Sequence, residues 1–256
     1  MGRGPVVAKR RDAVNAVKWK IFAIHAKLIA LAAQSGGDVD MNPTLAMEVE
    51  KAKKAWVPND NIDRAIKKWT GEDKDAAQIV EIVYEWHAAG WAAVIVQVLT
   101  DNKNRAAASI RHIFTKASGN MWTSGSVDWM FKRKGVIVID SEKHDYDSIE
   151  ELVMETDAED ITHEGREITI LTALEDFTTV EKFFNEQNIE LHSSELEFVP
   201  DNIVEITDFD KALKYKMLIN GFEEDEDVQN VFGNGKMSEQ LEEEVEAFIE
   251  KNTFRT

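Results

Sequence analysis

The spacing of apolar residues changes from a helical to a strand-like period near residue 78. Residues 12–34 carry Ala, Ile and Leu at helical spacing, and a Gly-Gly pair at 36–37 predicts the end of that helix. An Asn-Pro pair at 42–43 predicts a second helix, and Pro58 predicts the start of a third. The first 77 residues are therefore expected to form a helical domain.

From Gln78 onward, β-branched runs alternate with helical segments. The expected strands are 79–84, 92–99, 127–131, 136–139, 167–171, 191–199, 203–206 and 228–232. The expected helices are about 104–116, 147–157, 175–187, 208–221 and 238–250, the last capped by Ser238. Between 136 and 199 the order is strand, helix, strand, helix, strand, which is typical of a ferredoxin-like module. The predicted fold class is α+β.

Residues 57–68 hold the first candidate binding element. Pro58, with Asn59 or Asp60 as the capping residue, predicts a helix start. The side chains expected to form its buried stripe are Ile62, Ala65 and Ile66. The basic side chains off that stripe are Arg64, Lys67 and Lys68. These three face either a polyanion or, as on an ordinary amphipathic helix, only water.

A second candidate element follows the strand that ends at residue 99. Residues 100–105 read Thr-Asp-Asn-Lys-Asn-Arg and lead into a helix whose N-terminus attracts anions. The candidate phosphate contacts here are Asn102, Lys103, Asn104, Arg105, Arg111 and His112. Lys103 and Arg105 are expected to be exposed, so that replacing both leaves the fold intact. The alternative is a capped helix whose asparagines only hold the turn.

Charge is divided between the two halves of the chain. Residues 1–135 hold 21 Lys and Arg against 14 Asp and Glu, a net charge of +7, whereas residues 136–256 hold 9 against 34, a net charge of −25. The N-terminal candidates for nucleic-acid contact are Lys9, Arg10, Arg11, Lys18, Lys20 and Lys27. Such a chain can approach RNA or DNA with its basic half. A solvated charge pattern without a partner is the alternative.

Several functional classes are excluded by composition. The chain has no Cys, so it has no disulfide framework or thiolate metal site, which fits a reducing compartment. No apolar run is long enough for a membrane span, and the basic N-terminus lacks the apolar core of a signal peptide. The six His residues show no metal-ligand spacing, and no catalytic triad emerges. A cytoplasmic, non-enzymatic protein without metal or cofactor is expected.

Many short motifs occur in one order along nearly the whole chain. They are 18–22, Gly36-Gly37-Asp38, Asn42-Pro43, Leu45, 57–68, Thr70-Gly71, Tyr84-Glu85, 100–105, Arg111-His112, Gly119-Asn120, Gly125-Ser126-Val127, Gly135-Val136-Ile137 and Asp227-Val228-Gln229-Asn230-Val231. In this order they resemble the YebC/PmpR family, whose mitochondrial relatives are translational activators of cytochrome oxidase.

The resemblance implies a three-lobed fold and two alternative functions. The expected domains are 1–77, a helical basic domain; 78–134 with 206–256, an α/β domain; and 135–205, a ferredoxin-like domain inserted in the second. One function is that of a ribosome-associated translation factor that contacts rRNA and relieves stalling, for example at proline runs. The other is that of a DNA-binding transcriptional regulator. A monomer is expected, with neither a membrane nor a small-molecule substrate as partner.

Tryptophan departs from the family pattern. That pattern has glycine where this chain has Trp19, Trp69, Trp86, Trp91 and Trp122, and often where it has Trp56; only Trp129 stands where an aromatic residue is expected. Glycine is also scarce, at 13 of 256 residues. We hypothesise that the gene uses UGA for glycine and that these six positions were translated as tryptophan. The alternative is that they are base-stacking platforms beside a basic surface.

Overall fold

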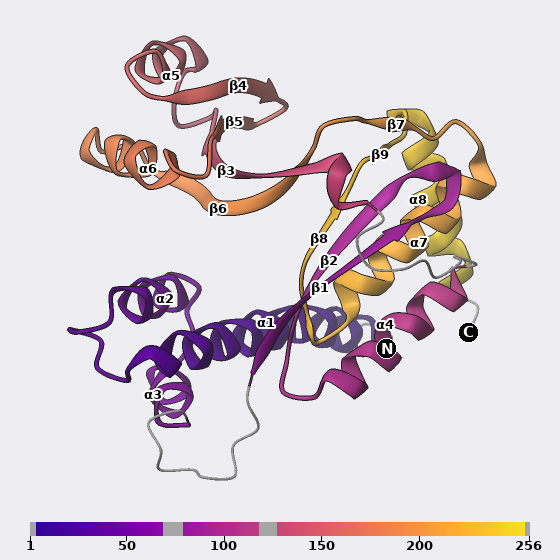
Figure 1. Cartoon of the computed structure of the whole chain (residues 1–256). Helices are drawn as coiled ribbons and strands as arrows, with labels where there is room; N and C mark the ends of the chain where they lie inside the picture. The colour runs from indigo at the N-terminus through magenta and orange to yellow at the C-terminus, as the bar shows by residue number, and fades with distance from the viewer. Residues whose placement is uncertain (1–3, 69–78, 118–126, 254–256) are drawn as a thin grey trace.

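The computed structural model describes residues 4–68, 79–117 and 127–253, with side chains from Lys18 to Asn252 within those ranges. Figure 1 shows a helical lobe around the long helix α1, a middle lobe with strands β1, β2 and β8, and a third lobe around β3 to β6. The chain leaves the middle lobe at β3 and returns to it after β6. The α+β class and the three lobes are confirmed, whereas the expected boundary residues stay predictions.

Three helices form the N-terminal lobe. They are α1 (Gly4–Ala32), α2 (Pro43–Lys54) and α3 (Asn59–Lys67). A single 3₁₀ turn follows α1 and ends at Gly36, which has a φ of 139°. The Asn42 side-chain oxygen accepts the Leu45 N–H at 3.1 Å, and its nitrogen donates to the carbonyls of Ala32 and Gly36 at 2.9 and 2.8 Å. One carboxamide thereby joins the end of α1 to the start of α2.

The start of α3 differs from the expectation. Neither Asn59 nor Asp60 caps it, because Asn59 is already the first helical residue and Pro58 holds the capping position without a side-chain hydrogen bond. The Pro58 carbonyl instead accepts the N–H groups of Asn61 and Ile62 at 2.9 and 3.2 Å. The expected stripe is confirmed: Ile62 and Ala65 are buried, and Ile66 packs against the same cluster.

The middle lobe is an antiparallel sheet in the order β1-β2-β8, covered by helices. Its strands are β1 (Val80–His87), β2 (Ala93–Thr100) and β8 (Val228–Gly233). Its helices are α4 (Lys103–Lys116), α7 (Phe209–Glu224) and α8 (Glu239–Thr253), and a short parallel pair joins β7 (Val204–Glu205) to β9 (Gly235–Lys236). Ser238 caps α8 as expected, by accepting the Leu241 N–H at 3.3 Å.

Every residue of strand β2 is buried, and its two faces contact all three lobes. One of its faces, with Val94, Val96 and Val98, packs against α4 and α7 in the largest apolar cluster. On its other face, Ile95 packs with residues at the entry to the third lobe, and Leu99 packs against Ala30 of α1. The near-continuous apolar run of β2 is therefore explained by burial on both sides.

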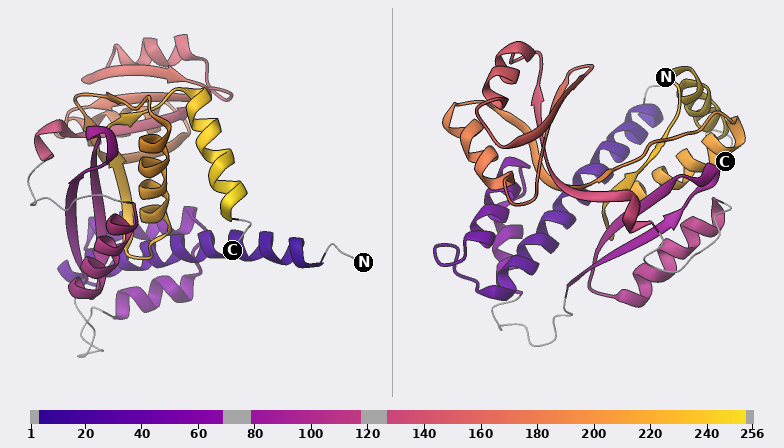
Figure 2. Two further views of the ribbon diagram at one scale, coloured as in Figure 1. Left: turned by 90° about the vertical axis from the view of Figure 1, so that its right-hand side faces the viewer. Right: turned by 45° about the horizontal axis from the view of Figure 1, so that its top comes forward.

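The third lobe is a ferredoxin-like βαββαβ unit. Its elements are β3 (Phe131–Asp140), α5 (Tyr146–Val153), β4 (Ala158–Glu164), β5 (Glu167–Thr172), α6 (Phe177–Glu186) and β6 (Leu191–Pro200). The sheet order is β4-β5-β3-β6, with every neighbouring pair antiparallel. The two views in Figure 2 show this lobe at the end of the molecule away from α3.

Two expectations for this region are wrong. The segment 127–131 is not a separate strand: Asp128–Met130 form a 3₁₀ turn, and β3 begins at Phe131. Strand β4 was not expected, and the helix predicted to reach residue 157 ends at Val153. Because β4 is an edge strand with mostly exposed, charged side chains, it lacks the apolar alternation that identifies a strand in a sequence.

Two of the anomalous tryptophans occupy backbone positions that favour glycine. Trp56 has a φ of 59° and is 85% exposed, and Trp91 has a φ of 68° and is 81% exposed. Trp56 closes α2: its N–H donates to the Lys53 carbonyl and the Val57 N–H donates to the Ala52 carbonyl, both at 3.0 Å, which is a Schellman motif with tryptophan where glycine is usual.

Trp91 follows Gly90, which also has positive φ, in the short turn between β1 and β2. The remaining tryptophans occupy other kinds of position. Trp86 lies one residue before the end of β1, buried among Phe114 and Phe222. Its Nε1 has no hydrogen-bond partner among the described residues. Trp19 is exposed on α1, and Trp69 and Trp122 lie outside the described residues.

We expect Trp56→Gly and Trp91→Gly each to raise the free energy of unfolding by up to about 1 kcal/mol. A left-handed conformation costs a non-glycine residue roughly 1–2 kcal/mol, which exceeds the roughly 0.5–1 kcal/mol that glycine loses through its freer unfolded chain. Denaturant unfolding of the purified variants measures the difference. The matched control is Trp129→Gly, since Trp129 is exposed but lacks positive φ; it should lose stability.

Loss of stability in Trp56→Gly and Trp91→Gly as well would contradict this backbone argument. The decoding hypothesis has its own test in the codons of the gene at the six positions. UGA at most of them supports the hypothesis, and UGG at most of them refutes it.

Candidate nucleic-acid interface and the clasp behind it

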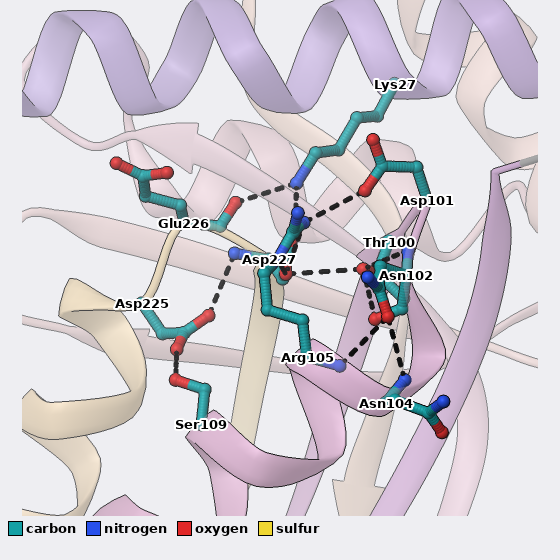
Figure 3. Close-up of polar contacts among 10 residues, drawn as sticks. All are labelled: Lys27, Thr100, Asp101, Asn102, Asn104, Arg105, Ser109, Asp225, Glu226 and Asp227. Carbon is teal, nitrogen blue, oxygen red and sulfur yellow. Dashed lines mark hydrogen bonds and ion pairs between the residues drawn. The ribbon is translucent and has the colours of Figure 1, made fainter. Parts of the chain in front are cut away.

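A buried carboxylate joins two candidate binding elements. Asp227, just before β8, is 6% exposed. Its Oδ1 lies 2.7 Å from Nζ of Lys27 on α1, and its Oδ2 lies 3.0 Å from Nη2 and 3.2 Å from Nε of Arg105 on α4. The Thr100 hydroxyl, at the end of β2, donates to Oδ2 at 3.3 Å. We call these four side chains the Asp227 clasp (Figure 3).

Local hydrogen bonds fix the position of Arg105. The Asn102 side-chain oxygen caps α4 by accepting the N–H groups of Asn104 and Arg105 at 3.1 and 3.0 Å. The Thr100 hydroxyl accepts the Asn102 N–H at 3.0 Å, which ties the turn to β2. A second carboxylate, Asp101, lies 3.0 Å from Nη2 of Arg105. The turn that holds these candidate phosphate contacts is therefore fixed by hydrogen bonds of its own side chains.

Contacts from α1 reach the same loop. Lys27 also donates to the Glu226 carbonyl at 2.9 Å, and Lys20 donates to the Glu223 carbonyl. The Asp225 side chain accepts the Asp227 N–H at 2.9 Å and the Ser109 hydroxyl of α4. The backbone carbonyls of the acidic run before β8 thus accept hydrogen bonds from α1, and the Asp225 carboxylate accepts one from α4. The side chains of Glu223, Glu224 and Glu226 remain exposed.

The electrostatics of the clasp follow from its burial and its cations. Burial alone would raise the pKa of Asp227, but the hydrogen bonds and charges of Lys27 and Arg105 outweigh it, so the pKa lies below its ordinary value. The hydrogen bond to Asp227 raises the pKa of Arg105. Burial lowers the pKa of Lys20, although Asp225 and Glu223 nearby act in the opposite direction.

The structure separates the sequence-predicted contacts into groups. The exposed members are Lys18, Arg64, Lys67, Lys103, Asn104, Arg111 and His112, with Lys68 partly buried. Lys20, Lys27, Asn102 and Arg105 have the intramolecular roles given above. The side chains of Lys9, Arg10 and Arg11 lie outside the described residues, although their backbone belongs to α1. Whether any of them touches nucleic acid stays a prediction.

One expectation about these residues needs correction. Arg105 is about half exposed, yet its guanidinium pairs with a buried carboxylate, so removing it leaves Asp227 with fewer partners. Replacing Lys103 and Arg105 together is therefore not a neutral test of binding. The missing signal in the sequence was Asp227 itself, which opens the motif Asp227-Val228-Gln229-Asn230-Val231 but follows an acidic run that resembles an ordinary solvated surface.

The described residues contain no group of three or more His, Asp or Glu that could hold a metal ion. None of the helices in the described ranges is both long enough and apolar enough to cross a membrane.

Comparison with known proteins identifies the family. Residues 5–72 match a family model described as the TACO1/YebC protein N-terminal domain, and residues 79–235 match one described as the TACO1/YebC second and third domain. The chain belongs to the YebC family. A structural relative of this YebC-family chain, the crystal structure of a conserved hypothetical protein from Aquifex aeolicus, superposes with a TM-score of 0.79 at 35% identity, covering 86% of this chain and 90% of that one.

Curated relatives carry a regulatory name. A protein of Maridesulfovibrio salexigens is 42% identical over 94% of this chain and 96% of its own length, and one of Halothermothrix orenii is 39% identical over 88% and 90%. Both are named "Probable transcriptional regulatory protein". The resemblance of the motifs is thus confirmed at the level of the family.

Asp227→Asn should lower the free energy of unfolding by about 2 kcal/mol. The change removes a charge that two cations share, and hydrogen bonds to charged groups contribute roughly 1.5–3 kcal/mol each. The cost stays below that of a fully buried pair because Arg105 can turn to solvent. Denaturant unfolding measures the loss. The control is Glu224→Gln, an exposed neighbour with the same charge change, which should alter the free energy of unfolding little. Equal losses in the two variants would show that the clasp does not stabilise the fold.

The clasp also predicts a dependence on pH. Because the folded-state pKa of Asp227 lies below the ordinary 3.8, the carboxylate contributes stability above that value and loses it as the pH falls through the folded pKa. The difference in unfolding free energy between the wild type and Asp227→Asn should therefore be constant near neutral pH and narrow below about pH 4. Denaturant titrations between pH 7 and pH 3 test this, and a constant difference would contradict it.

Proposed function

We propose that this YebC-family chain is a nucleic-acid-binding regulator of gene expression that acts on the ribosome through rRNA. The observation that carries the proposal is the arrangement of cations, all exposed except the partly buried Lys68, on two lobes that the Asp227 clasp joins. Arg64 and Lys68 lie on or beside α3, and Lys103 and Arg111 lie on α4. A fixed pair of basic elements can match phosphates that are themselves fixed in a folded RNA.

The arrangement of the lobes supports a shaped RNA surface. Figures 1 and 2 show α3 and α4 toward one end of the molecule and the ferredoxin-like lobe toward the other. The end with α3 and α4 belongs to the basic half of the chain, and the ferredoxin-like lobe contains much of the acidic half. Repulsion between phosphates and the acidic lobe then selects one orientation at the binding surface.

A ribosomal target accounts for these features better than duplex DNA. DNA readers commonly insert one recognition helix into the major groove and dimerise to match half-sites. Here the cations are divided between helices of separate lobes. We propose a monomer that acts in the cytoplasm, without catalysis or a small-molecule substrate, and relieves stalling at difficult codons such as proline runs.

The second candidate is a DNA-binding transcriptional regulator. The specific observation in its favour is the name that both curated relatives carry, "Probable transcriptional regulatory protein". Both candidates use the same cations, so binding to polyanions in general does not distinguish them.

Removing cations from either lobe should weaken ribosome binding about tenfold or more and reduce its salt dependence. Each neutralised phosphate releases counterions, so each lost contact lowers the slope of log K against log salt by roughly 0.7–0.9. The variants are Arg64→Ala with Lys68→Ala, and Lys103→Ala with Arg111→Ala. Lys182→Ala with Lys214→Ala, exposed lysines of α6 and α7, is the charge-matched control. Co-sedimentation with purified ribosomes across a salt series measures the slope, and equal effects in all three variants would reject a localised interface.

Deleting the gene separates the two candidate functions. A translation factor predicts higher ribosome occupancy at particular codon runs without a change in the matching mRNA levels. A promoter-binding regulator predicts that mRNA levels change first and that footprinting finds a discrete protected site. Ribosome profiling beside RNA sequencing measures both, and changes confined to mRNA abundance would favour the transcriptional alternative.

A further inference from the structure

An open groove of about 780 Å³ lies in the N-terminal lobe, between α1 and α3. Ala23, Ala26 and Ala30 line it from α1, and Ala65 lines it from α3. The three alanines of α1 are spaced three and four residues apart, so they share one face of that helix. Because none of these side chains extends beyond Cβ, the two helices leave an open hollow between them, whose apolar lining also includes Trp19, Phe22 and Ile79.

Cationic and amide side chains border the same groove. Arg64 and Lys68 lie along the α3 side, and the Arg64 guanidinium is held by the Asn61 side-chain oxygen at 3.0 Å. Lys27 also lines the groove, and its Nζ pairs with Asp227. An apolar floor beside cations is complementary to a ligand that combines a flat apolar part with negative charge.

We propose that this groove binds unpaired nucleotides of single-stranded RNA, with a base against the alanine floor and phosphates at Arg64 and Lys68. The inference rests on the proposed function and specifies the part of the RNA that is recognised. The groove size lies within the roughly 300–1,000 Å³ usual for sites that enclose small molecules. Paired bases are excluded, since a duplex hides their faces, whereas unpaired bases stack on aromatic rings and on guanidinium planes.

Arg64 supplies the stacking plane in this proposal. It is exposed, and its bond to Asn61 orients the guanidinium at the border of the groove. Trp19 also lines the groove and is exposed. The proposal does not require it: with glycine at position 19 the alanine floor and Arg64 remain, and that end of the groove becomes wider.

The test compares two labelled RNA strands by fluorescence anisotropy. One is a twelve-nucleotide oligouridine, and the other has the same length and backbone but carries no bases. The wild type should bind oligouridine about fivefold or more tightly, since a base stacked on a guanidinium plane adds a contact that the abasic strand lacks. Ala23→Phe, which fills the groove, should reduce the affinity for oligouridine to that of the abasic strand. Ala247→Phe, on the exposed side of α8, is the matched control and should keep the preference for bases.

Thermal unfolding shows whether Ala23→Phe folds. If it does not, a second variant still tests the proposal. Arg64→Lys retains the charge but removes the plane, so it should lose most of the preference for bases. Equal binding of the two strands by the wild type would overturn the groove proposal while leaving phosphate binding intact. A preference for oligouridine over the abasic strand that survives both variants would also overturn the proposal. That result would be expected if a protein segment, and not RNA, were the natural occupant of the groove. Absence of binding to either strand would instead overturn the RNA-binding function.

Discussion

The relation between the N-terminal lobe and the rest of the molecule depends on one buried carboxylate. Asp227 lies where α1, the start of α4 and the start of β8 meet, and its two oxygens are shared between Lys27 and Arg105. A buried carboxylate is unfavourable unless it is paired and hydrogen-bonded, so the cations must come to it. Apolar packing between Ala30 and Leu99 supports the same junction but is not directional. The clasp therefore supplies the orientation that the apolar contact lacks.

This use of charge changes how the basic half of the chain is interpreted. Lys20, Lys27 and Arg105 belong to the positive excess, yet their contacts lie within the molecule. Among the described residues, the candidate contacts that remain exposed include Arg64 on α3 and Lys103 and Arg111 on α4. Net charge alone overestimates the binding surface, because part of it stabilises the arrangement in which the remaining cations are presented. Lys and Arg side chains on neighbouring helices thus serve two ends: some stabilise the fold, and others remain available to a polyanion.

Sequence reasoning succeeded where a local signal determines the element. The helix starts at Asn42 and Asn102 follow from capping chemistry, and the buried stripe of α3 follows from its periodicity. It failed where structure depends on distant partners. Within the described part of the chain, strand β4 pairs with β5 alone and is mostly exposed, so its own residues carry little apolar pattern. Arg105 resembled a free phosphate ligand because its partner, Asp227, lies 122 residues further along the chain. The structure shows the cap by Asn102, whereas contact between the same turn and a phosphate stays a prediction.

The tryptophans show how backbone geometry can test a residue's identity. At the ends of helices, left-handed positions are usually filled by glycine and sometimes by asparagine. Helix α6 follows this rule, since Asn188 takes a φ of 59° at its end, with the same pair of hydrogen bonds as at Trp56. The chain thus builds one Schellman motif twice, once with a tolerant residue and once with a bulky one. Because the Val57 N–H and side chain close the motif at α2 without any contribution from the indole, the fold requires the φ angle at position 56 and not the side chain. This mismatch is what a glycine codon decoded as tryptophan would produce.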